Sequence, residues 1–284
     1  MRVGPILRNV GEPSRQNMLA VARAADELGF QSLWATTHTA IPVRFESHYP
    51  YDPTGRPSWD ATTPWGDAFV SLAFAAAVTE RVRLGPSVIP LITTDPLTLA
   101  KQAATLDLYS GGRLELGIGA GWLVEEAQAL GRPTDHRSAR LEETIAILRL
   151  AWSRETFSYA GRFWNFPEVG VNPKPAQGDR LPIWIGGQGQ RAVEIAARHG
   201  CGLMLWFAEP DAVRNYVARL RAAGGTGPVA AAMPLVPNAG RWLELSGDYV
   251  KAGTDQLILT SYGQLSRVTE ELERFAAEVL PELR

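Results

Sequence analysis

Short apolar runs alternate with amphipathic segments along most of the chain. Runs typical of buried strands occur at 2–7, 32–36, 82–88, 113–119, 181–187, 201–207, 228–236 and 255–260. Segments typical of helices follow them at 14–29, 64–79, 95–109, 138–152, 191–199, 211–222 and 242–251, with a last helix that ends at 280. Apolar strands joined by helices indicate a parallel sheet buried on both faces, so the alternation predicts an α/β fold.

The number of these units selects one architecture within the α/β class. Eight strand–helix units favour a (β/α)8 TIM barrel over an open, doubly wound sheet, and a barrel accommodates all of 1–284 as one domain. Two insertions interrupt the alternation: a lid loop at 37–63, after the second strand, and a segment at 155–179, before the fifth. We expect both to lie at the C-terminal mouth of the barrel, where ligands bind, or to lead back to it.

Composition narrows the classes of function. The chain is 45% hydrophobic and 20% charged, with a formal charge of −2 at pH 7, which gives no electrostatic basis for binding nucleic acid or an anionic membrane. The single cysteine, Cys201, excludes an internal disulfide and a cysteine-based zinc site. The histidines do not pair at metal-ligand spacing, so no metal is expected. Because the sequence lacks a signal-peptide pattern and an apolar run of roughly 20 residues, we expect a cytoplasmic protein.

The stretch GGRLELGIGAGW at 111–122 places glycines at alternate positions where the fourth strand ends. The dinucleotide-binding fingerprint differs from it, because that fingerprint needs G-x-G-x-x-G at the start of a first helix. For Gly117, bending and packing of a barrel strand explain the glycine. For Gly119 and Gly121 two interpretations stay open: strand bending, or the close approach of a planar cofactor that Trp122 would also contact.

A second glycine-rich turn, IGGQGQ at 185–190, leads directly from the fifth strand into a helix. Such a turn presents free backbone N–H groups and the positive end of the helix dipole, which together bind phosphate. Gly186, Gly187, Gln188 and Gly189 are therefore candidate cofactor-binding residues. The alternative is an ordinary turn between a strand and a helix.

Together these segments resemble the bacterial luciferase-like monooxygenase family, and within it the branch that depends on the deazaflavin coenzyme F420. The matching motifs keep their order on the predicted strands and extend to about residue 223. They are GFQSLWATTHTAIP at 29–42, YPYDPTGR at 49–56, TERVRLGPSVIPL at 79–91, DPLTLAKQAATLDLYSGGRLELGIGAGW at 95–122, EEAQALG at 125–131, YAGRFWNF at 159–166 and LPIWIGGQGQRAVEIAARHGCG at 181–202.

The resemblance implies a barrel that binds a flavin or deazaflavin at its mouth. A non-prolyl cis peptide bond on the third strand, at Ser87–Val88, would support the ring system of the cofactor. The exit of the fourth strand, Gly119–Trp122, would line the ring or its tail, and the turn Gly187–Gly189 would hold the cofactor phosphate. Relatives often dimerise, so a homodimer is also expected.

One departure from the family pattern bears on the chemistry. Relatives commonly end the second strand in Asp-His, and those that oxidise alcohols add a glutamate after the glycines of the fourth strand. Here the two places hold Thr37-His38 and Trp122, so alcohol dehydrogenation is not expected. Thr37 and His38 are the candidate catalytic positions, with His38 as the only obvious titratable group that can donate or take a proton near the ring. A structural hydrogen bond from His38 to a loop is the alternative.

Aromatic residues supply the remaining candidates. Tyr49, Tyr51 and Trp59 on the lid and Trp206 at the end of the sixth strand are candidate substrate-binding residues, with packing alone as the alternative. The leading hypothesis is an F420-dependent oxidoreductase that transfers hydride between the deazaflavin and a small apolar or aromatic substrate. The alternatives are an FMN-dependent monooxygenase that uses reduced flavin and oxygen, and a barrel that binds ligands without catalysis.

Overall fold

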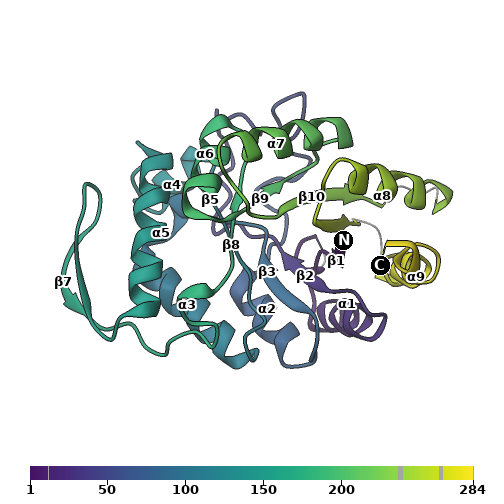
Figure 1. Ribbon diagram of the computed structural model, residues 1–284, viewed down its shortest axis with the longest axis horizontal. Coiled ribbons are helices and arrows are strands. Elements are labelled where there is room, and N and C mark those ends of the chain that lie inside the picture. The colour runs from purple at the N-terminus through teal and green to yellow at the C-terminus, as the bar shows by residue number, and fades with distance from the viewer. Residues whose placement is uncertain (12, 236–238, 262–264, 284) are drawn as a thin grey trace.

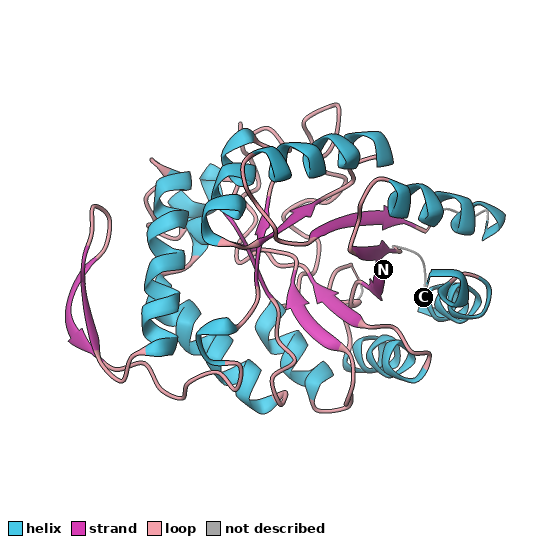
Figure 2. Cartoon of the chain, in the orientation of Figure 1, coloured by secondary structure: helices cyan, strands magenta, loops and turns pink. Residues whose placement is uncertain are grey.

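A computed structural model describes residues 1–11, 13–235, 239–261 and 265–283. The barrel strands occupy the centre of the molecule and helices surround them (Figures 1 and 2). The strands are β1 (Arg2–Pro5), β2 (Ser32–Ala35), β3 (Arg83–Pro86), β4 (Ile89–Pro90), β5 (Leu116–Gly119), β6 (Phe157–Ala160), β7 (Asn165–Val169), β8 (Ile183–Gly186), β9 (Gly202–Leu205), β10 (Val229–Pro234) and β11 (Gln256–Thr260). The helices are α1 (Arg15–Glu27), α2 (Ala68–Ala76), α3 (Pro96–Tyr109), α4 (Val124–Ala129), α5 (Arg137–Ser153), α6 (Gln190–His199), α7 (Pro210–Ala222), α8 (Trp242–Lys251) and α9 (Leu265–Glu278).

The central strands run parallel and follow one another around a barrel. Among the described residues, one sheet has the order β1-β11-β10-β9-β8-β5-β4, and β2 pairs with β3. Parallel bridges between Ile6 and Trp34, and between Leu84 and Leu114, link this pair to the larger sheet on both sides. β3 and β4 are the two halves of one strand, separated by Ser87–Val88. The expected (β/α)8 architecture is therefore confirmed.

Helix ends follow capping residues that are visible in the sequence. Ser14 caps α1 by accepting a hydrogen bond from the backbone N–H of Asn17. Asp95 caps α3 in the same way, with Pro96 in the first turn. Gly200 ends α6 at φ 62°, a left-handed conformation that glycine adopts without strain.

Two elements differ from the sequence-based expectation. The insertion at 155–179 contains an antiparallel hairpin, β6–β7, which lies on the side of α5 away from the barrel (Figure 1). Glu143 of α5 holds the tip of this hairpin by accepting hydrogen bonds from the backbone N–H groups of residues 162–164. The segment after β5 forms the short helix α4, whose six residues are too few to show a helical period.

Two tryptophans fill the barrel below its mouth. The rings of Trp34 and Trp184 are both buried and meet edge to face, with their centroids 6.1 Å apart. Glycines on the neighbouring strands make room for them: a Cβ at Gly85 would lie 2.4 Å from Trp34, and one at Gly202 would lie 2.3 Å from Trp184. The indole pair is the packed floor beneath the C-terminal mouth.

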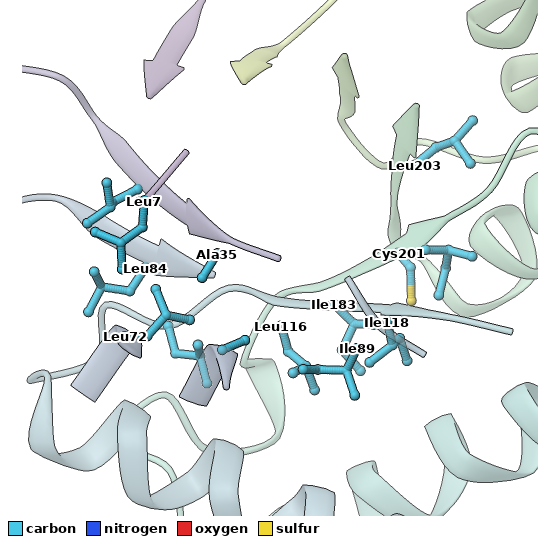
Figure 3. Close-up of a cluster of buried hydrophobic side chains, with 14 of the residues drawn as sticks. Leu7, Ala35, Leu72, Leu84, Ile89, Leu116, Ile118, Ile183, Cys201 and Leu203 are labelled. Atoms are coloured by element: carbon cyan, nitrogen blue, oxygen red, sulfur yellow. The ribbon is translucent and has the colours of Figure 1, made fainter. Parts of the chain in front are cut away.

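A second apolar layer lies between the strands and the helices. Leu84 of β3 lies beside Leu72 of α2 (Figure 3), and both are fully buried. This burial holds the helices against the barrel. Of the helices in the described ranges, none has both the length and the apolar character needed to cross a membrane.

The N-terminal end of the barrel holds a buried carboxylate. Glu115 is 2% exposed and accepts hydrogen bonds from the guanidinium groups of Arg2 and Arg83 and from the indole N–H of Trp184. Burial alone would raise the pKa of Glu115, but these three donors outweigh it and hold the pKa below its ordinary value. The network ties together the first residues of several strands.

Candidate active site

A cavity of about 800 Å³ opens at the C-terminal ends of the barrel strands. This volume is typical of sites that take a cofactor or a drug-sized ligand. Its walls come from the segments after β2, β3, β5, β8 and β9, and the lid at 37–63 covers part of it. Every candidate site residue expected from the sequence lines this cavity except Gly187, and no described residue of 155–179 does.

The interrupted strand between β3 and β4 shapes one wall. The peptide bond between Ser87 and Val88 is cis, as the family resemblance implied. A Cβ at Gly119 would lie 3.0 Å from the Val88 side chain, and one at Gly186 would lie 2.8 Å from it. The Ser87 hydroxyl donates to the sulfur of Met204, 3.2 Å away across the barrel. The glycines that end β5 and β8 therefore make room for Val88, and their backbones border the cavity.

The turn after β8 borders the cavity except at Gly187, whose backbone N–H donates to the carbonyl of Met204. Gly189 is the N-cap of α6 and offers no side-chain oxygen to the N–H groups of the first turn. Apart from its neighbours in the chain, no described atom lies within 4 Å of a Cβ placed at Gly189, so there is open space in front of the helix. Gln188 donates to the carbonyl of Trp206 at 2.6 Å, and the Tyr216 hydroxyl donates to the Gln188 carbonyl at 2.5 Å. This arrangement holds the turn in place and suits an anionic group such as phosphate.

The lid brings a cluster of aromatic rings over the mouth. The ring centroid of Trp59 lies 4.8 Å from that of His38 and 6.1 Å from that of Trp122. Tyr49 lies 5.1 Å from Trp122. Trp65, which the sequence analysis missed, also packs against His38 at 4.8 Å. The imidazole is thus enclosed by indole rings on the side of the lid.

The cavity lining carries little charge. Among the described residues, neither lysine nor arginine lines the cavity, and Asp52 is the only acidic residue that does. Burial, together with the neighbouring Tyr216, raises the pKa of Tyr51 to about 12, so its hydroxyl stays protonated at neutral pH. Met204 and Phe207 extend the apolar surface on the side of β9. Away from the turn after β8, the lining suits an uncharged compound of aromatic or apolar character.

The end of β2 is held in place by a buried amide. Asn9 is fully buried and donates to the carbonyl oxygens of Thr36, at 2.6 Å, and Gly66, at 3.0 Å. Because these bonds fix the backbone just before the lid, Thr37 and His38 both reach the cavity wall.

His38 has a carboxylate partner that the sequence analysis missed. Its Nδ1 lies 2.8 Å from Oε2 of Glu126, whose side chain is 1% exposed. The other oxygen of Glu126 accepts hydrogen bonds from the backbone N–H groups of Thr39 and Ala40. His38 is therefore not the isolated titratable group that we expected. The family pattern drew attention to position 122, where Trp122 stands, and nothing in the spacing links residue 126 to the end of β2.

The comparisons with known proteins agree with this fold. The chain belongs to the luciferase-like monooxygenase family, whose family model matches residues 3–237. An uncharacterised protein of Mycobacterium tuberculosis is 35% identical over 192 residues, which is 67% of each chain. Membership of the family confirms the resemblance seen in the sequence, and it makes the chain an oxidoreductase of the luciferase-like class.

A flavin-dependent relative and a deazaflavin-dependent enzyme of the same fold are also similar to this chain. The oxygenase component of the flavin-dependent trigonelline monooxygenase of Acinetobacter baylyi is 28% identical over 190 residues, 66% of this chain and 47% of that protein. A solved structure of an F420-dependent secondary alcohol dehydrogenase in complex with an F420-acetone adduct matches with a TM-score of 0.80 and 17% identity, over 100% of this chain and 99% of the other. Proteins similar to this chain thus include deazaflavin-dependent and flavin-dependent enzymes.

Proposed function

We propose that this chain is an F420-dependent oxidoreductase that transfers hydride between the deazaflavin and a small, uncharged substrate of apolar or aromatic character. The observation that carries the proposal is the cavity of about 800 Å³ between the Ser87–Val88 peptide bond and the N-terminus of α6. The first end suits a flat ring system, and the second suits a phosphate. The space under the aromatic lid remains for the substrate.

The second candidate function is that of an FMN-dependent monooxygenase. The similar enzyme of Acinetobacter baylyi is a flavin-dependent monooxygenase, and FMN shares with F420 a three-ring system and a phosphate. The two cofactors differ in their chemistry, because reduced FMN reacts with oxygen whereas the deazaflavin transfers hydride only.

The protein contributes positioning, exclusion of water and one proton. The deazaflavin, when bound, supplies the hydride chemistry at its C5 atom. The Val88 side chain and the backbones of Gly119 and Gly186 would support the ring, and the lid would exclude water from it. His38 directs Nδ1 towards Glu126, which leaves Nε2 to exchange a proton with the substrate.

Titration of the purified chain with F420 and with FMN, followed by fluorescence, tests the choice of cofactor. We expect F420 to bind and FMN not to displace it. Tight binding of FMN without affinity for F420 would overturn the proposal in favour of the monooxygenase. Affinity for neither cofactor would favour a barrel that binds other ligands without this chemistry.

The same titration of a Gly189→Asp variant tests the phosphate end of the cavity. Aspartate is a good N-cap residue, so α6 should remain at least as stable, while its carboxylate engages the free N–H groups and repels a phosphate. We expect cofactor affinity to fall by about 10- to 100-fold, as for the loss of one hydrogen bond to a charged group. Gly189→Ser is the matched control, because it caps without charge and should weaken binding less. Wild-type affinity in the aspartate variant would mean that the phosphate binds elsewhere.

We also propose that two copies of the chain associate through the outer face of α2 and α3. α2 contains no charged residue, and two of its apolar residues, Val70 and Phe74, are 59% and 46% exposed. On the adjacent α3, Leu108 and Tyr109 are 43% and 79% exposed. Apolar helix faces of this kind are typical of protein interfaces.

Phe74→Glu should therefore give a monomer in light scattering, whereas Leu243→Glu on α8 should leave a dimer. A monomeric parent chain would contradict the proposal.

A further inference from the structure

Glu126 is so deeply buried that both oxygens of its carboxylate need hydrogen-bond partners. Its side chain is 1% exposed, and a buried carboxylate is tolerated only when its oxygens are paired. Its described partners are Nδ1 of His38 and the backbone N–H groups of Thr39, at 2.6 Å, and Ala40, at 3.1 Å. No lysine or arginine of the described ranges forms a salt bridge with it. The carboxylate is therefore committed to His38 and to the start of the lid.

The contact bears on which nitrogen of His38 carries the hydrogen. Because an ionised carboxylate only accepts hydrogen bonds, a Glu126 carboxylate favours the tautomer with its hydrogen on Nδ1 of the imidazole. Nε2 is then the ring atom left for the cavity, which His38 lines. A neutral ring takes a proton at Nε2, and a protonated ring gives one up from the same atom. The direction of the Glu126 contact thus fixes the atom at which proton exchange takes place.

The same carboxylate joins two strand ends that border the cavity. His38, Thr39 and Ala40 follow β2, whereas Glu126 lies on α4, which follows the exit of β5. One side chain therefore sets the imidazole and the first turn of the lid relative to the wall that contains Trp122.

The adjacent Glu125 makes similar contacts without touching His38. Its Oε1 accepts hydrogen bonds from the backbone N–H groups of Glu46 and Ser47 at 2.7 and 3.1 Å. The Ser47 hydroxyl in turn accepts one from the backbone N–H of Val124. The chain thus contains a matched control: a neighbouring glutamate on the same helix that holds the lid at another place.

We propose that Glu126 is a positioning residue that fixes the Nδ1–H tautomer and the orientation of His38 and, through the same carboxylate, ties the start of the lid to α4. The effect on turnover rests on the proposed function. The tautomer and the lid contact do not rest on it, and they are measured without cofactor or substrate.

Heteronuclear NMR of the imidazole nitrogens tests the proposal directly. The His38 signals are assigned by their loss in His38→Asn, and in the wild-type chain they should show the Nδ1–H form. In Glu126→Gln the amide oxygen still accepts from the backbone, but the amide NH₂ now donates to Nδ1. His38 should therefore change to the Nε2–H form. Glu125→Gln should keep the wild-type form.

Two results would overturn the positioning role. One is a wild-type His38 in the Nε2–H form, which is decisive even if Glu126→Gln does not fold. The other is a folded Glu126→Gln chain, checked by circular dichroism, in which the His38 signals do not change.

Kinetics separate this proposal from the proposed function. We expect Glu126→Gln to lower kcat by about 10²-fold with little change in KM, because Nε2 of a ring in the Nε2–H form can no longer take a proton. A changed tautomer with unchanged turnover would support the positioning role and refute the part of the proposed function that assigns the proton to His38.

Discussion

Replacing His38 with asparagine is expected to slow hydride transfer by about 10²- to 10⁴-fold, the usual contribution of a positioned general acid or base. The asparagine amide can still donate to Glu126, so the start of the lid should keep its contacts. It has no proton to exchange at neutral pH. Single-turnover mixing, followed by the absorbance of the deazaflavin, measures the step directly, and cofactor affinity should stay near that of the parent chain.

His48 provides the control for this substitution. It is exposed on the same lid and is absent from the cavity lining, so His48→Asn should turn over at the parent rate. A parent-like rate in His38→Asn would reduce His38 to a structural hydrogen-bond partner of Glu126. A structural role of this kind is the alternative that the sequence alone leaves open.

The barrel followed from the sequence because it depends on local patterns, whereas Ser87–Val88 in the cavity wall was located through the family resemblance. Each strand is a short apolar run followed by an amphipathic helix, and the C-terminal ends of parallel strands meet at one rim. Residues that follow different strands, such as Thr37, Ser87 and Gly121, therefore converge even though they are far apart along the chain. Once the order of the strands was recognised, the location of the site followed.

The roles of individual residues could not be predicted from the sequence, because they depend on contacts between elements that are far apart along the chain. The glycine at 119 faces the side chain of Val88, and the glycine at 121 combines φ 83° with a Cβ position only 2.4 Å from Ile92. Neither neighbour is visible in a linear pattern. Glu126 lies 88 residues from His38 on a helix too short for periodicity, so only the fold reveals the pair.

At the opposite end of the barrel, Glu115→Ala is expected to lower the free energy of unfolding by about 3 kcal/mol, the lower end of the range for breaking a buried ion pair. The side chains of Arg2 and Arg83 are 35% and 30% exposed, so water would partly replace the hydrogen bonds that their guanidinium groups lose with the carboxylate. The indole N–H of Trp184, in contrast, would be left buried without its acceptor. Urea denaturation at neutral pH measures the change.

Glu115→Gln isolates the contribution of the charge, since the amide retains an acceptor for Trp184 and nearly the same volume. The folded-state pKa of Glu115 lies below its ordinary value of 4.5, so the charge stabilises the fold fully above that pH. The stabilisation is lost as the pH falls through the folded-state pKa. The difference in unfolding free energy between the parent and Glu115→Gln should therefore shrink in acid. A difference that stayed constant down to the lowest pH at which both chains fold would assign the stabilisation to packing instead of charge.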